Sequence, residues 1–159
     1  KKVYENIKQK IKEIVEKLQE KDNKVWIRPE TTGKATQFGS YKELLKISSE
    51  LEQVMPVIDF SHVHARTNKY NTYQEFKEIL AETEKQLGRY GLDNMHIHIS
   101  GINYSEKGER NHLILEESDM NYKDLLKVLK EFNAKGCVIC ESPNIEDDAL
   151  LMQKYYEKL

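Results

Sequence analysis

The sequence lacks the features that mark a membrane or exported protein. No apolar run in its 159 residues approaches the roughly 20 residues that a membrane-spanning helix needs. The chain opens with Lys1-Lys2 and an amphipathic helical pattern, whereas a signal peptide has an apolar segment there. We therefore expect a cytoplasmic protein that has no membrane partner.

An excess of charge of one sign is missing as well. Lysine and arginine number 25 and acidic residues 27, which gives a net charge of −2. A chain of this kind has no general attraction for nucleic acid. Binding to DNA would require a local group of basic residues.

Cysteine is scarce: Cys137 and Cys140 are the only two, in the apolar run GCVIC. Their C-x-x-C spacing is found in metal and redox sites. In a strand, however, residues three apart point to opposite faces, so these two thiols do not form a pair. We expect two buried cysteines with a structural role.

Helical and strand periodicities alternate along the rest of the chain. Apolar residues make up 38% of it, enough for one core, so residues 1–159 are expected to form a single domain. The expected helices are 3–18, 41–51 with Ser40 as N-cap, 73–87 with Thr72 as N-cap and Gly88 and Gly91 at its end, 122–132 and 147–156; the expected strands are 24–28, 54–59, 95–99 and 137–140.

Strands that alternate with helices, without a hairpin signal, indicate an α/β fold with parallel strands and right-handed crossovers. Four such β-α units cannot close a (β/α)₈ TIM barrel, which needs about 250 residues, or at least about 200. Two interpretations remain. The chain is part of a TIM-barrel-like fold that another chain or further residues complete, or it is a small open sheet.

Metal-capable side chains stand at the ends of all four expected strands. They are Glu30, Asp59, His98 and Glu141. The carboxyl ends of parallel strands meet at one rim of the sheet, where such folds keep their chemistry. A metal site is therefore predicted at this rim; the alternative is a set of polar residues that satisfy one another in a barrel core.

The loops after the second and third strands offer further ligands. His62 follows Asp59 by three residues, and a loop of about a dozen residues after the third strand carries Glu109 and His112. All five histidines lie at or beside strand ends. Mixed histidine and carboxylate ligands suit Zn²⁺, with Mn²⁺ or Fe²⁺ as substitutes.

The succession PETTG, DFSHVHAR, HIHISG, GERNH and CESP resembles the C-terminal half of the endonuclease IV family. Members of this family are apurinic/apyrimidinic endonucleases within the xylose-isomerase-like TIM barrels. The resemblance runs from about Lys24 to the end of the chain. It implies a DNA repair enzyme that uses up to three zinc ions to cleave the phosphodiester 5′ to an abasic site. DNA containing abasic sites would be the substrate.

The resemblance also implies a role for each motif residue. Glu30 and Glu141 would bridge metal ions and act in catalysis, and Asp59 and His62 would be a ligand pair. His98 is the expected histidine ligand of the third strand, with His96 as the competing choice. Glu109 and His112 match the family only loosely, because a Glu-x-x-His pair stands where Asp-x-His is common. The expected DNA contacts are Arg66, Lys69, Lys107 and Arg110.

The family takes further histidine ligands from N-terminal strands that this sequence does not supply. A missing N-terminal half or a second copy of the chain is therefore an expected partner. Two other functions stay open. Sugar isomerases and epimerases of the same barrel superfamily use similar ligands and a carboxylate or histidine base, and a non-catalytic half-barrel could serve as an assembly module.

Overall fold

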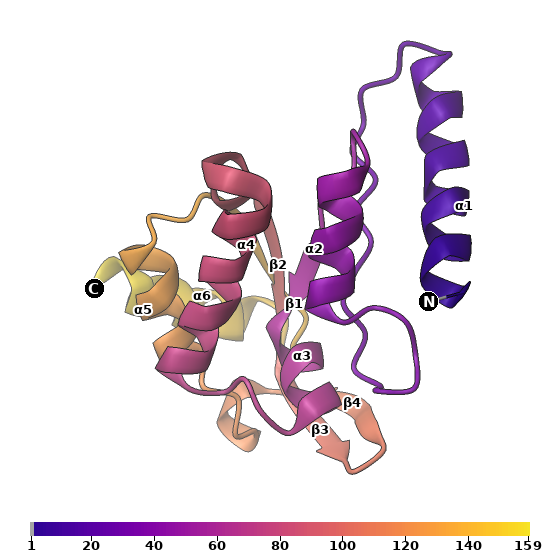
Figure 1. Cartoon of the computed structure of the whole chain (residues 1–159). Coiled ribbons are helices and arrows are strands. Elements are labelled where there is room, and N and C mark those ends of the chain that lie inside the picture. The colour runs from indigo at the N-terminus through magenta and orange to yellow at the C-terminus, as the bar shows by residue number, and fades with distance from the viewer. Residues whose placement is uncertain (1) are drawn as a thin grey trace.

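A computed structural model describes residues 2–159 (Figure 1). Its centre is a parallel sheet with the strand order β1 (Val57–Asp59), β2 (Met95–Ile99), β5 (Gly136–Cys140). The chain before β1 joins this sheet through two isolated parallel bridges, Ile27 to Val54 and Glu30 to Val57. The expected strand at 24–28 is thus reduced to single contacts. The expected α/β fold with parallel strands is confirmed.

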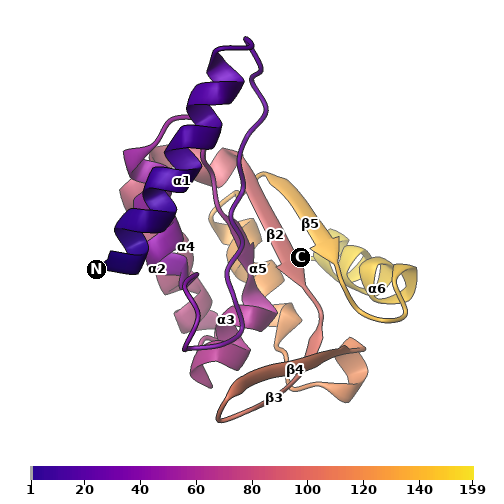
Figure 2. The same cartoon turned by 90° about the vertical axis from the view of Figure 1, so that its right-hand side faces the viewer.

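Helices cover one face of the sheet, and a hairpin lies across the carboxyl ends of its strands (Figures 1 and 2). Helix α4 packs against α2 and α5, and α5 packs against α6. The remaining elements are α1 (Lys2–Gln19), α2 (Tyr41–Glu50), α3 (Phe60–Thr67), α4 (Tyr73–Asp93), β3 (Gly101–Ser105), β4 (Gly108–Leu113), the 3₁₀ turn η1 (Leu115–Glu117), α5 (Tyr122–Glu131) and α6 (Glu146–Glu157).

The two expected N-caps are both present. Ser40 and Thr72 each accept a hydrogen bond from the backbone N–H three residues on, and the Glu43 and Glu75 carboxylates accept one from the cap backbone N–H. Such reciprocal capping satisfies amide groups that have no partner within the helix, and one cap contributes about 1 kcal/mol. The caps place the starts of α2 and α4 where the sequence predicted.

Two expected loops are regular structure instead. The segment DFSHVHAR forms helix α3 directly after β1, because the Asp59 carboxylate accepts a hydrogen bond from the His62 amide at 2.7 Å and caps the helix. The expected loop after β2 is the antiparallel hairpin of β3 and β4, which pairs Ile102 with His112. In addition, Gly88 interrupts α4 with a φ of +67° without ending it, and helical residues continue to Asp93.

The two faces of the central sheet differ, because successive side chains of a strand point to opposite faces. Ile58, Ile97 and Ile99 point to the helix-covered face and are at most 2% exposed. They belong to a core cluster with apolar residues of α4 and α5. Asp59 and His98, in register on neighbouring strands, lie on the other face. The apolar face holds the sheet on its helices and leaves the polar face for the site.

The outer edge of β5 is open. Within residues 2–159, no strand pairs with that edge, and Val138 and Ile139 are each 42% exposed. Cys137 is exposed and Cys140 half-buried, so the expectation of two buried cysteines is wrong. The reason is that β5 is the last strand of the sheet and has nothing on its far side to cover it.

The turn into β5 depends on a glycine. Gly136 has a φ of +120°, and a Cβ there would lie 1.9 Å from the carbonyl oxygen of Met95. We expect Gly136→Ala to lower the free energy of unfolding by at least about 2 kcal/mol more than Gly88→Ala, because Gly88 also has positive φ but open space around it. Urea unfolding of both variants measures the difference. Equal losses would show that backbone strain, rather than the close approach to Met95, controls this turn.

Candidate metal centre

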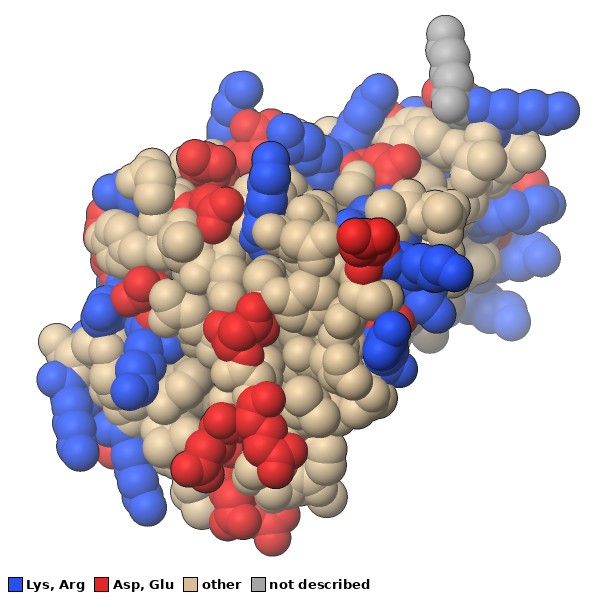
Figure 3. Space-filling model, turned by 90° about the horizontal axis from the view of Figure 1, so that it is seen from below, with Lys and Arg blue, Asp and Glu red and all other residues tan. Residues whose placement is uncertain are grey.

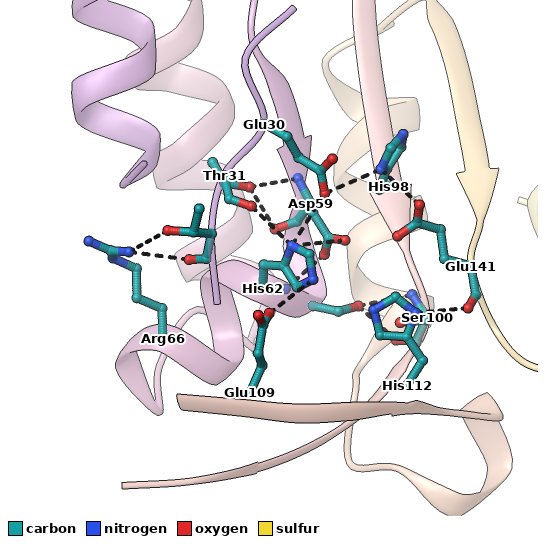
Figure 4. Close-up of polar contacts among 12 residues, drawn as sticks. Glu30, Thr31, Asp59, His62, Arg66, His98, Ser100, Glu109, His112 and Glu141 are labelled. Atoms are coloured by element: carbon teal, nitrogen blue, oxygen red, sulfur yellow. Dashed lines mark hydrogen bonds and ion pairs between the residues drawn. The ribbon is translucent and has the colours of Figure 1, made fainter. Parts of the chain in front are cut away.

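Four of the predicted ligands converge at the carboxyl end of the sheet (Figure 4). One ligand atom from each lies within 4.8 Å of the ligand atoms of the other three; the four residues are Glu30, Asp59, His98 and Glu141. His98 Nδ1 lies 3.4 Å from Glu30 Oε1 and 3.2 Å from Glu141 Oε1. Asp59 is fully buried, whereas both glutamates are partly exposed. The group therefore has one closed side and one side open to a substrate.

Two hydroxyl residues, which the sequence analysis did not single out, hold the strand ends in place. The Thr31 hydroxyl accepts a hydrogen bond from the Asp59 amide at 2.8 Å and donates one to the Asp59 carbonyl. The Ser61 hydroxyl donates to the Ser100 carbonyl at 2.7 Å and accepts from the Ser100 amide. Thr31 directly follows Glu30, and Ser61 directly precedes His62, so position beside a predicted ligand was the available signal.

The remaining predicted ligands form a second group beside the first. His62 Nε2 lies 3.1 Å from Glu109 Oε2, and the rings of His62 and His112 are 5.7 Å apart. In each of the two imidazoles, Nδ1 lies within hydrogen-bond distance of a backbone carbonyl oxygen. His62 contacts the carbonyl of Thr31, and His112 contacts that of Glu141, both at 3.0 Å. When the ring is neutral, donation from Nδ1 leaves Nε2 with a free lone pair, which is how metal-binding histidines are commonly oriented.

Glycines allow the hairpin to reach the site. Gly108 has a φ of +96°, and a Cβ there would lie 2.3 Å from the Gly33 carbonyl oxygen. The Glu109 amide donates to that same carbonyl at 3.0 Å. A Cβ on Gly33 would overlap the Glu109 carboxylate, at 2.0 Å from Oε2. The glycines of PETTG and GERNH therefore meet, and their contact places Glu109 beside His62.

Unpaired buried atoms show that the site suits a cation. Asp59 Oδ2, His98 Nδ1 and Glu109 Oε2 are buried and make no hydrogen bond of good geometry, although each has an ion-pair contact at 3.1–3.4 Å. A buried polar atom without a partner is costly, and each of these atoms can offer a lone pair. Three carboxylates and an imidazole within coordination reach are a ligand set for a divalent ion. The residues present fit a bound metal ion.

The crowding of these groups shifts their pKa values. Burial raises the pKa of Asp59 to about 6. Burial alone would lower the pKa of His62, but the hydrogen bond to Glu30 and the charges of Asp59 and Glu109 raise it to about 9. Contact with His62 in turn lowers the pKa of Glu30. Without a metal ion, the positive charge of His62 partly neutralises the carboxylates.

These shifts predict an unusual pH dependence for the metal-free chain. A raised pKa means that the folded state holds its proton more tightly than the unfolded state does, so stability falls as pH rises through the folded pKa. For His62 the window runs from 6.5 to about 9. We expect the free energy of unfolding to fall by about 2–3 kcal/mol between pH 6.5 and 9.

Urea unfolding in chelator at pH 6.5, 7.5 and 9 measures this loss. The variant His62→Gln should give a flatter profile, because it removes the titrating group. Stability that is constant or that rises over this range would contradict the assignment of a protonated His62.

The predicted DNA contacts occupy different positions. The Arg66 guanidinium donates to the carbonyls of Lys34 at 2.6 Å and Gln37 at 2.7 Å, so it clamps the loop after Glu30. Lys69, Lys107 and Arg110 are exposed, the last two on the hairpin. On the face seen from below, the described residues carry both charge signs, with acidic side chains gathered towards its middle and lower part and no continuous basic strip (Figure 3).

Comparison with known proteins agrees with this architecture. A family model described as "Xylose isomerase-like TIM barrel" matches residues 1–158, so the chain belongs to that family. The chain is also similar to "Uncharacterized protein MJ0133" of Methanocaldococcus jannaschii, with 50% identity over 157 residues. The match covers 98% of this chain and 57% of that relative. The chain therefore spans a little over half the length of a relative it closely resembles.

A search of the helices in residues 2–159 found none long and apolar enough to cross a membrane.

Proposed function

We propose that this chain carries the metal centre of a DNA repair endonuclease that hydrolyses the phosphodiester 5′ to abasic sites. The observation that supports this best is the pair of adjacent ligand groups, Glu30, Asp59, His98 and Glu141 on one side and His62, Glu109 and His112 on the other. Two neighbouring divalent ions suit phosphodiester hydrolysis, because when bound they lower the pKa of water and neutralise charge on the phosphate. A centre with a single ion would need fewer ligands.

Each side chain then has a distinct task. Glu30 and Glu141 have side chains 37% and 30% exposed, so they can accept hydrogen bonds from an attacking water and orient it as well as bind metal. Asp59 is buried and acts as a ligand and helix cap only. Zn²⁺ is the proposed ion, since histidine and carboxylate ligands together suit it, and Mn²⁺ or Fe²⁺ are the substitutes.

Lys69, Lys107 and Arg110 are the proposed phosphate contacts, because each is exposed on a segment that flanks the site. Arg66 does not contact DNA in this proposal. Its guanidinium already binds the loop that carries Thr32 and Lys34, so it positions the loop rather than a phosphate.

Further β-α units are the proposed protein partner of this chain. The open edge of β5 and the length of the M. jannaschii relative both support a sheet that extends beyond the strands described. These units would come from further sequence or from a second copy of the chain, and they would supply any ligands that the family takes from other strands. A non-catalytic half-barrel is the corresponding proposal if no activity accompanies assembly.

A metal-dependent sugar isomerase or epimerase is the second candidate. The family description supports it, since it names xylose isomerase, and the first ligand group could bind a polyol. The basic residues on the hairpin and the second ligand group favour the nuclease.

The test is incision of a duplex with a single abasic site, with and without chelator, beside an aldose–ketose interconversion assay on the same preparation. Chelator-sensitive incision supports the nuclease. Chelator-resistant incision would reject the metal mechanism, and sugar turnover without incision would support the isomerase. Neither activity, in protein that contains metal, would favour the non-catalytic module.

A further inference from the structure

His96 has no task in the proposed site, yet its ring faces a metal ligand. It precedes His98 by two residues on β2, so both side chains lie on the polar face of the sheet. The two Nε2 atoms are 3.3 Å apart, and the rings meet edge-on at 5.1 Å. This contact needs an explanation because two imidazole nitrogens attract each other only through a shared proton or a shared cation.

A shared cation fits poorly. The four ligand atoms that lie within 4.8 Å of one another include one from His98 and none from His96. The positive charge of Arg28 also acts on His96, and its guanidinium lies over the Trp26 ring on the same stretch of chain. A positive charge that acts on this imidazole disfavours a second cation at that point. The contact is therefore a hydrogen bond between the two rings.

The direction of this hydrogen bond follows from the other nitrogen of His98. Its Nδ1 faces Glu30 and Glu141 and has no hydrogen-bond partner, so Nδ1 is the atom aimed at the ion. A neutral imidazole that ligates through Nδ1 carries its proton on Nε2. That proton points at His96 Nε2, which must then accept it.

Resting on the metal centre proposed above, we infer that His96 is a positioning residue: it accepts the Nε2–H of His98 and so fixes the tautomer and ring orientation that turn Nδ1 towards the carboxylates. Partners of this kind act on metal affinity without touching the ion, and their loss commonly weakens binding 10–100-fold. His96 touches neither the substrate nor the ion in this arrangement.

The first test compares three variants by Zn²⁺ competition with a chromophoric chelator. His96→Phe keeps a ring but removes the acceptor, and we expect 10–100-fold weaker binding. His96→Gln places an acceptor oxygen near the position of Nε2 and should restore affinity to within about threefold. Ile139→Val, at the β5 position in register with His98, is the control and should bind as the wild type does.

Three outcomes distinguish a failure of the His96 inference from a failure of the proposed metal centre. Wild-type affinity in a folded His96→Phe variant would overturn the role of His96 and leave the metal centre intact. Equal losses in His96→Phe and His96→Gln would also overturn it, because the acceptor would then be irrelevant. A wild-type chain that binds no divalent ion would reject both the metal centre and this inference.

The second test reads the tautomer directly. Nitrogen-15 NMR of the Zn²⁺-bound wild type should show His98 protonated at Nε2 and His96 with Nε2 as an unprotonated acceptor. Coordination of zinc by His96 Nε2 would overturn the inference, whatever the affinities. If incision is absent but these signals appear, the endonuclease proposal fails while the role of His96 stands.

Discussion

Replacing Glu141 by glutamine should lower metal-dependent incision by at least about 100-fold. The change keeps the size of the side chain but removes the negative charge that faces His98 Nδ1 at 3.2 Å. An amide oxygen is a weaker ligand than a carboxylate, and the amide nitrogen cannot accept a proton from water. Loss of one member of the four-residue group thus affects both metal binding and the orientation of the attacking water.

The measurement is the rate of abasic-site incision, with metal content determined by elemental analysis of the same samples. Glu116→Gln is the matched control, since Glu116 is exposed in η1 and belongs to neither ligand group. Cys137→Ala is a second control, and it should leave the rate unchanged because Cys137 is an exposed thiol outside both groups. An unchanged rate in Glu141→Gln would reject the proposed mechanism.

Substituting lysine for Val138 should strongly weaken self-association of the isolated chain. The unpaired edge of β5 presents backbone groups, and Val138 lines a cavity of about 290 Å³ with Ile97 and Met152 beside that edge. Exposed edges of this kind pair with other strands. We therefore expect the wild-type chain to sediment above its monomer mass of 18.7 kDa at micromolar concentration.

A lysine at this position would place a charge in the interface between two copies of the chain. Burying that charge costs several kcal/mol, so association should weaken by more than about 100-fold. Val3→Lys is the control: Val3 is 59% exposed on α1, away from β5. Sedimentation velocity over a concentration series measures both variants. A wild-type chain that stays a stable monomer at all concentrations would count against a partial barrel that needs further strands, and it would favour a small open sheet.

Much of the fold could be predicted because local signals agreed with it. The capping boxes at Ser40 and Thr72 set the starts of α2 and α4, and the apolar stripe of residues 3–18 became α1. The alternation of β2 placed His96 and His98 on the face opposite Ile97 and Ile99. These features depend on residues a few positions apart, so the sequence is sufficient to determine them.

The departures arise where one local pattern is compatible with more than one structure. Asp59 was interpreted as a strand end before a loop, but the same carboxylate caps α3. The two-residue turn at Glu106-Lys107 has neither the Asn-Gly nor the Asp-Gly pair that marks a hairpin in a sequence. Strands β3 and β4 still form there, and Gly108 packs on the Gly33 backbone. Apolar GCVIC looked like a buried strand, although burial of β5 depends on a neighbour that the described residues do not supply.

The sequence by itself determined the order of the five long helices and the three strands of the central sheet, and which side chains stand at the strand ends, because periodicity and capping act within single segments. Only the tertiary structure decided that Glu109 and His112 belong beside His62, and that Arg66 clamps a loop. It also paired His96 with His98 and left the edge of β5 open. The physical reason is that contacts between distant segments depend on strand pairing and ring orientation, and no spacing along the chain encodes either.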